Sequence, residues 1–193
     1  KENDCIGIMG ESGAGKTTLI NILLGLIRPQ TGIIKLNGKK IDFSETMKSF
    51  SAYLPQDPII LDDTIENNIS LEQDEHKIDS ERFQDSIKKA NLTDVINNLP
   101  NGKKTLIGEN GVRLSGGQSR RVAIARTFYH RKKIIIMDEA VNSLDKKTEA
   151  LVTEQIKDLK GKTAIILISH DKNSLKYCDK VLYIKNQGIT QNF

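Results

Sequence analysis

The amino-acid sequence predicts an α/β fold with a mainly parallel central sheet. Short apolar runs of the kind found in buried strands alternate with segments whose apolar residues recur at helical spacing. Such alternation is typical of parallel strands joined by crossover helices. From Thr64 to about Tyr129 the patterns are helical only, which predicts an α-helical subdomain inserted into the sheet-containing part.

The first half of the chain begins with a strand, a loop and a helix. Residues 5–9 form an apolar run that ends at a glycine-rich loop, and helical spacing follows over residues 17–26. Residues 33–36 precede Asn37-Gly38, which predicts a strand entering a hairpin turn. Residues 51–54 predict another short strand.

The second half continues the same alternation. Within the helical stretch, Asp79 or Ser80 is available to cap a helix. The later predicted elements are a buried strand over 133–137, a helix over 145–160 ended by Gly161, a strand over 164–169, and a hairpin of 181–184 with 188–189.

Composition defines the class of protein more than its function. With 193 residues, 37% hydrophobic and 28% charged, the chain is typical of one soluble globular domain. A net charge of +4 from scattered lysines favours a solvated surface over a nucleic-acid interface. Cys5 and Cys178 lie far apart in the sequence without metal-ligand spacing, which favours reduced thiols.

Neither the apolar runs nor the first residues predict a membrane segment. The longest apolar runs, 134–137 and 164–168, are far shorter than the roughly 20 residues that span a bilayer. The chain starts at Lys1 without an initiator methionine or a signal sequence, so we expect a fragment that begins inside a domain.

A phosphate-binding motif lies between the first predicted strand and helix. Glycines allow backbone amides to converge on phosphate oxygens, and the helix that follows directs its positive end toward them. Lys16 can reach the β and γ phosphates, and the Thr17 hydroxyl can ligate Mg²⁺. Together with the adjoining Thr18, the ATP-binding residues predicted here are Gly10, Glu11, Ser12, Gly13, Ala14, Gly15, Lys16 and Thr17.

Two carboxylates follow the buried strand over 133–137. Asp138 and Glu139 are expected at the carboxyl edge of the parallel sheet, beside the phosphates. We predict that Asp138 holds Mg²⁺, directly or through water, and that Glu139 acts as the general base that polarises the attacking water.

A second glycine-rich turn precedes another helix. In Leu114-Ser115-Gly116-Gly117-Gln118, helix N-terminal amides and the Ser115 hydroxyl can bind an anion. Because one ATP cradle is already present, this second surface, with Ser115, Gly117 and Gln118, is expected to serve a nucleotide on another subunit. The sequence therefore predicts a dimer.

The order and spacing of these three motifs resemble those of ABC ATPase domains over almost the whole chain. The resemblance implies a P-loop NTPase core with a mainly parallel sheet, an antiparallel β-hairpin region and the inserted helical subdomain. It implies a single domain over 1–193, with a catalytic core of about 1–63 and 131–193 and a helical subdomain of about 64–130. It also implies a head-to-tail dimer in which the second turn closes over the γ-phosphate of the partner's ATP.

Three further positions match the family. Gln56 resembles the glutamine that senses Mg²⁺ and the attacking water and connects to the membrane domain. His170 resembles the histidine that contacts the γ-phosphate. Asp145, in Ser143-Leu144-Asp145, resembles the aspartate that reaches across the dimer.

Residues 105–111 resemble the T-x-x-G-E-x-G segment of exporters, which touches the coupling helices of the transmembrane domains. The resemblance implies a motor domain at the cytoplasmic face of the cell membrane. Its partners would be transmembrane domains, encoded upstream or as a separate subunit, and a second ATPase domain, with no nucleic acid. Lipids, peptides, oligosaccharides and drugs remain open as substrates.

The chain departs from the family pattern at three places. Ser119 stands where arginine is common, and Asn142 begins the loop that usually starts with serine. The aromatic residue that stacks on adenine in this family is expected upstream of Lys1.

Three other functions remain as alternatives. A soluble ABC ATPase of translation or DNA repair would carry paired cassettes or long coiled coils. A P-loop small-molecule kinase would leave residues 114–118 and His170 without a role, and a non-catalytic nucleotide-binding module would not need the acidic pair.

Overall fold

The computed structural model describes residues 3–36, 38–40, 47, 49–139, 144–185 and 188–192. Internal contacts divide the chain into two compact units. Unit 1 comprises Lys1–Tyr53, Lys132–Glu139 and Lys160–Phe193, and unit 2 comprises Leu54–Arg131 and Ala140–Leu159. The predicted subdomain boundaries near 64 and 130 stay predictions.

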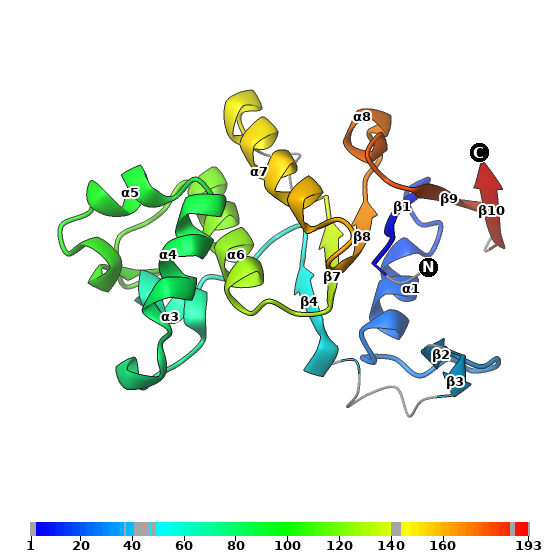
Figure 1. The fold of residues 1–193 in the computed structure, drawn as a ribbon, viewed down its shortest axis with the longest axis horizontal. Helices are drawn as coiled ribbons and strands as arrows, with labels where there is room; N and C mark the ends of the chain where they lie inside the picture. Colours follow the sequence, from blue (N-terminus) through cyan, green and yellow to red (C-terminus); the bar gives the residue numbers. More distant parts are fainter. Residues whose placement is uncertain are drawn as a thin grey trace. The chain divides into compact units, whose positions relative to one another are not determined.

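Unit 1 contains a mainly parallel sheet (Figure 1). The parallel pairs are β1 with β8, β1 with β9, and β7 with β8, whereas β10 pairs with β9 in the antiparallel sense. This arrangement confirms the predicted fold class, including the hairpin at the end of the chain. Among the described residues the order of the six strands is β10 (Gly188–Asn192), β9 (Lys180–Lys185), β1 (Cys5–Gly10), β8 (Ala164–Ile168), β7 (Ile134–Asp138) and β4 (Ser51–Leu54).

Helix α1 (Lys16–Leu23) packs against this sheet through one apolar cluster. Burial of this cluster stabilises the strand and helix that flank the glycine-rich loop, since each buried aliphatic side chain contributes about 1.5–3 kcal/mol. Its buried members are Ile8, Ile20, Leu24, Ile136, Ile168 and Ile184.

Helix α1 ends earlier than the predicted residue 26. Leu24 is its C-cap, and Gly25 adopts a left-handed φ of 72°, which ends the helix. Leu26, counted in the helical pattern, is 61% exposed. The predicted hairpin that follows is present as the antiparallel pair β2 (Lys35–Leu36) and β3 (Lys39–Lys40), while its turn residue Asn37 lies outside the described residues.

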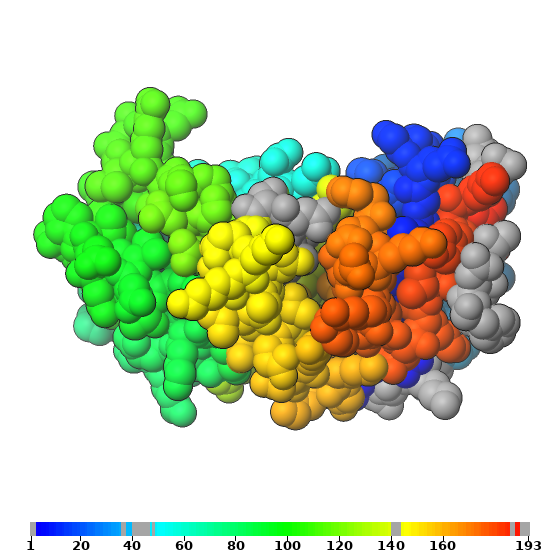
Figure 2. All heavy atoms as spheres, turned by 90° about the horizontal axis from the view of Figure 1, so that it is seen from above, coloured from blue at the N-terminus to red at the C-terminus, as the bar shows by residue number. Residues whose placement is uncertain are grey.

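Unit 2 is mainly helical and is organised around α6 (Gly116–Tyr129), which packs against α3 and α4. Residues on nearly every side of α6 are buried, which explains its lack of a single apolar stripe. The atoms of α4, α5 and α6, in green shades, form one continuous body (Figure 2). The other helices of this unit are α3 (Ile65–Ser70), α4 (Ser80–Lys89), α5 (Thr93–Asn97) and α7 (Lys146–Leu159).

Some short elements were absent from the sequence prediction. In unit 2, β5 (Asp63–Thr64) pairs with β6 (Leu106–Ile107), and 3₁₀ turns occur at Glu75–Lys77 and Gly102–Lys104. In unit 1, α8 (Lys172–Leu175) follows β8 and is capped by Asp171. These elements have two to four residues, too few to produce a clear periodic pattern. Within the described part of the chain, no helix has the length and apolar character to cross a membrane.

Candidate functional site

The glycine-rich loop of unit 1 connects β1 to α1. Gly13 and Gly15 have φ values of 77° and 98°, a left-handed conformation that side chains disfavour. No described atom lies within 4 Å of a Cβ built on either glycine, so conformation rather than space requires glycine there. At Gly10 the reason is different, because a Cβ would lie 2.7 Å from the carbonyl oxygen of Ile184.

The side chain of Lys16 folds back over this loop. Its Nζ donates hydrogen bonds of 2.8 Å to the carbonyl oxygens of both Gly10 and Glu11. The ammonium group is therefore held at the start of the loop. Thr17 and Thr18, at the start of α1, are exposed, as are Glu11 and Ser12 in the loop.

Asp138 ends β7 and is partly buried. Burial, and then the charge of Glu139, raise the pKa of Asp138 above its usual value, against the opposing effects of Tyr53 and Lys16. The Tyr53 hydroxyl donates a hydrogen bond of 3.5 Å to Asp138 Oδ2. Burial and the same carboxylate raise the pKa of Tyr53, so the phenol remains a donor at neutral pH.

Glu139 follows Asp138 in a left-handed backbone conformation, with a φ of 49°. Its amide donates a 2.9 Å hydrogen bond to the carbonyl oxygen of Ile168 in β8, which holds this turn in place. Its Oε1 lies 2.9 Å from Nδ1 of His170. Because an ionised carboxylate only accepts hydrogen bonds, Nδ1 is the donor. Glu139 is 19% exposed and His170 69%, so the carboxylate is sheltered beside an accessible imidazole.

In unit 2, Ser115 is the N-cap of α6. Its hydroxyl accepts a 3.3 Å hydrogen bond from the amide of Gln118, and the Gln118 side chain accepts one of 2.8 Å from the amide of Ser115. This reciprocal pair is a capping box. Gly117 lies in the first turn of the helix, which leaves its N-terminus free of bulky side chains.

Gln56 and Asp145 also belong to unit 2. The Gln56 side chain is exposed, while its carbonyl oxygen accepts a hydrogen bond from Arg120, a residue of α6 that is only 5% exposed. Asp145 Oδ1 accepts a 3.0 Å hydrogen bond from the amide of Thr148, and hydrogen bonding to Thr148 lowers the pKa of Asp145. Ser143, in the predicted loop before Asp145, lies outside the described residues.

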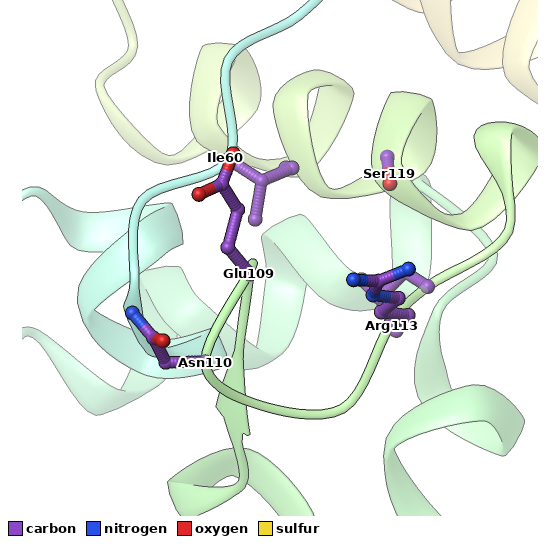
Figure 3. A pocket seen from close by; sticks show the side chains of 7 residues that line it. Ile60, Glu109, Asn110, Arg113 and Ser119 are labelled. Atoms are coloured by element: carbon purple, nitrogen blue, oxygen red, sulfur yellow. The ribbon is translucent and has the colours of Figure 1, made fainter.

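The predicted T-x-x-G-E-x-G segment borders a hollow of about 770 Å³ in unit 2. Glu109 extends toward Ile60, and Arg113 lies on the other side of the loop, nearer Ser119 (Figure 3). Asp62 holds the loop by accepting hydrogen bonds from the backbone and side chain of Asn110 at 3.1 and 2.7 Å. Gly108 is required here, because a Cβ would lie 2.3 Å from Asp62 Oδ1.

The structure thus brings Glu139 and His170 into contact and places the phosphate loop, Lys16 and Asp138 in the same unit. Two residues that contact the site were not predicted. Tyr53 is hydrogen bonded to Asp138, from which it is 85 residues away in the sequence. Arg120 is hydrogen bonded to the carbonyl oxygen of Gln56, from which it is 64 residues away. No local pattern marks such long-range partners.

Comparison with known families identifies the chain. The family described as ABC transporter matches residues 1–142, which include the phosphate loop, residues 114–118 and the acidic pair. The chain belongs to the ABC transporter family. Its similarity to ATP-binding parts of this family extends over nearly the whole chain, as two relatives and a solved structure show.

Two curated relatives of this ABC transporter chain are much longer than it is. It is 36% identical over 188 residues to an ABC transporter ATP-binding/permease protein of Haemophilus influenzae, covering 96% of this chain and 34% of that protein. It is 35% identical over 194 residues to an ATP-dependent lipid A-core flippase of Ralstonia nicotianae, covering 99% of this chain and 33% of that protein. The chain therefore spans about a third of the length of these relatives.

A solved structure supports the same assignment. A bacterial Atm1-family ABC exporter with ATP bound matches with a TM-score of 0.88 and 30% identity, over 96% of this chain and 32% of that one. The ABC transporter chain is thus an ATP-binding ATPase domain of the exporter type, with the P-loop fold predicted from its sequence.

Proposed function

We propose that this ATPase domain is the motor of a membrane exporter or flippase, in which ATP binding and hydrolysis drive substrate translocation. The observation that carries the proposal is the pair formed by Glu139 and His170, 2.9 Å apart at the carboxyl edge of the sheet that also carries the phosphate loop. A sheltered carboxylate at this edge has the chemistry that hydrolysis needs.

Glu139 is the proposed general base. Its carboxylate accepts a proton from the attacking water, while the hydrogen bond from His170 orients the side chain. Lys16 stabilises the charge on the β and γ phosphates. When ATP binds, phosphate oxygens replace the carbonyl oxygens of Gly10 and Glu11 as the hydrogen-bond acceptors of the Lys16 ammonium group. His170 keeps Nδ1 on Glu139 and offers the Nε2 of its exposed imidazole to the γ-phosphate.

The oxygen donors of the phosphate-binding region fit Mg²⁺, which prefers hydroxyl, carboxylate and phosphate ligands. The Thr17 hydroxyl is exposed at the start of α1, and Asp138 presents a carboxylate at the end of β7. These two residues of unit 1 are the proposed metal ligands. When bound there, Mg²⁺ neutralises phosphate charge. Ionised Asp138 is unfavourable in the metal-free fold, since its pKa is raised, and a cation would relieve that cost.

A second copy of the domain completes the site in this proposal. Ser115, Gly117 and Gln118 bind the γ-phosphate of the partner's ATP in a head-to-tail dimer. The Ser115 hydroxyl accepts a bond from Gln118, so its own hydrogen can be donated to a phosphate oxygen. Asp145 reaches across the same interface, with its charge favoured by Thr148.

The membrane partners are transmembrane domains, which the names of the ATP-binding/permease and flippase relatives support. The domain would then work at the cytoplasmic face of the membrane. Residues 105–111, beside the hollow that Glu109 and Arg113 line, are the surface proposed to contact those domains.

Glu139→Gln tests the proposal. We expect this variant of the full chain to lose at least about 100-fold in ATP turnover, because the amide cannot accept the proton. ATP affinity should stay within about threefold of the parent. In the presence of Mg²⁺ and ATP the variant should accumulate as a dimer, measured by size-exclusion chromatography with light scattering.

Glu154→Gln provides the control, since Glu154 is an exposed residue of α7 outside the proposed site. It should leave turnover and oligomeric state unchanged. Turnover of the Glu139→Gln variant at the parent rate would exclude Glu139 as the base.

A further inference from the structure

The two cysteines of the chain lie together in unit 1 although 173 residues separate them in sequence. Both are free thiols, and their sulfur atoms are hydrogen bonded at 3.4 Å. A disulfide requires a sulfur separation of about 2.05 Å, so the two atoms need to approach by roughly 1.3 Å, which is within reach of side-chain rotation.

The backbone around this pair is already held in place. The amide of Cys5 donates a 2.8 Å hydrogen bond to Asp179 Oδ2, and the amide of Asp179 donates one of 2.7 Å to the carbonyl oxygen of Cys5. Lys160 holds the Asp179 carboxylate through an ion pair of 2.7 Å. The absence of a side chain at Gly7 leaves room for the Cys178 sulfur, which a Cβ there would meet at 3.3 Å.

Cys5 begins β1, and Cys178 precedes the parallel neighbour β9 by two residues. The phosphate loop begins at the other end of β1, five residues away or about 17 Å along the strand. A bond between the sulfurs would therefore join the starts of two paired strands without touching the nucleotide site.

We propose that Cys5 and Cys178 form an oxidative modification site, closing to a reversible intramolecular disulfide when exposed to a peroxide. One thiolate attacks a peroxide oxygen, becoming a sulfenic acid as the O–O bond breaks and water is released after protonation. The second thiol then attacks that sulfur, forming the S–S bond and expelling a second water. Two thiols and one hydrogen peroxide give one disulfide and two waters, and two electrons pass from sulfur to oxygen.

Local chemistry assigns the order of these steps. The hydrogen bond between the two sulfurs lowers the pKa of Cys5, which favours Cys5 as the first nucleophile. Hydrogen peroxide is close to water in size and approaches through the partly exposed Cys178. Cys178 then resolves the sulfenic acid from its position in contact with Cys5.

The test is oxidation of the reduced full chain with hydrogen peroxide, followed by intact mass and thiol counting. We expect the mass to fall by two hydrogens and the free thiols to fall from two to zero, with both changes reversed by dithiothreitol. Because the closed loop is long, the oxidised chain should unfold about 10 °C higher than the reduced chain. Cys178→Ser should gain oxygen on Cys5 instead of losing hydrogen, and a sulfenic-acid probe should label it.

Oxygen addition to the parent chain without loss of two hydrogens would overturn the proposal, as would disulfide-linked dimers in place of an oxidised monomer. Cys178→Ser conserves size at a partly exposed position, so this comparison does not depend on replacing the buried Cys5. The readouts are mass, thiol count and unfolding temperature, and none of them depends on transport or ATP hydrolysis.

Discussion

Residues at the end of β7 combine buried charge with an unfavourable backbone conformation. Asp138 is partly buried and adjoins a second carboxylate, and Glu139 has a φ of 49°. Each feature costs stability, the left-handed conformation by about 1 kcal/mol or more. In the proposed mechanism both carboxylates are needed beside the phosphates, so these costs are expected where function and stability compete.

Asp138→Asn should therefore stabilise the nucleotide-free fold and abolish ATP hydrolysis. The pKa of Asp138 is raised in the folded state, so its contribution favours folding below pH 3.8 and is lost as the pH rises through the folded pKa. The buried charge costs stability as the pH rises, so we expect the neutral amide to raise Tm by a few degrees at pH 7 in thermal unfolding.

Measuring Tm of the variant and the parent over a range of pH provides the control. The difference in Tm between Asp138→Asn and the parent should vanish below about pH 3.8, where both side chains are neutral. A lower Tm of the variant at pH 7 would show that the hydrogen bond from Tyr53 outweighs the cost of burying the charge.

Among the elements, α6 carries both a structural and a proposed binding role at one end. Its capping box satisfies amides that otherwise lack partners at a helix N-terminus. The N–H groups of a first helical turn can also bind an anion, which is the role proposed for this end of α6. The other residues of the helix are largely buried, including Val122 and Ile124. The helix is thus held as a rigid support for residues 115–118.

Substitutions at Ser115 separate these two roles. Ser115→Ala should destabilise the chain by about 1 kcal/mol, measured by urea unfolding, because the cap is lost. Ser115→Asp keeps a good N-cap and should retain the parent stability. Its negative charge would repel the partner's γ-phosphate, so we expect loss of ATP-dependent dimerisation in a Glu139→Gln background. Normal dimerisation of the Ser115→Asp variant would limit Ser115 to capping.

At the scale of the whole molecule, each unit has its own stabilising centre. Unit 1 relies on the apolar cluster between α1 and the sheet, whereas unit 2 also contains a buried acidic residue, Glu66 of α3, only 3% exposed at its side chain. Lys103 and Lys104 each form an ion pair with one of its two carboxylate oxygens. Lys104 also forms an ion pair of 2.7 Å with Glu75. Burial would raise the pKa of Glu66, but the hydrogen bonds from both lysines outweigh it and lower that pKa.

This cluster should contribute to resistance against acid. Because the folded pKa of Glu66 is lowered, its stabilising effect is present above pH 4.5 and is lost as the pH falls through the folded value. We expect Glu66→Gln to cost about 1–2 kcal/mol in urea unfolding at pH 7, and this cost to shrink below pH 4.5.

Glu75→Gln is the matched control, because Glu75 is 68% exposed and pairs with the same Lys104. Exposed ion pairs contribute little, so its free energy of unfolding should stay within about 0.5 kcal/mol of the parent. An equal loss of unfolding free energy in both variants would show that the contribution of the Glu66 ion pairs does not depend on the burial of Glu66.

Local patterns made much of this chain predictable. The phosphate loop, the strand that ends in Asp138 and the helix after residues 114–118 were each visible because strand and helix periodicity, glycine conformation and helix capping act within a few residues. The same patterns could not predict that α1 stops at Gly25 rather than at Leu26, since Leu26 fits the apolar spacing but finds no interior to enter.

The sequence by itself therefore determined the fold class, the order of the motifs and the family to which they belong. Only the tertiary structure decided which distant residues meet: Glu139 with His170, Tyr53 with Asp138, and Cys5 with Cys178. The physical reason is the distance along the sequence over which each effect acts. Periodicity and turn chemistry depend on neighbours along the chain. These contacts arise because β7 lies between β8 and β4 in the sheet and β1 pairs with β9, which brings together strand ends that the sequence separates.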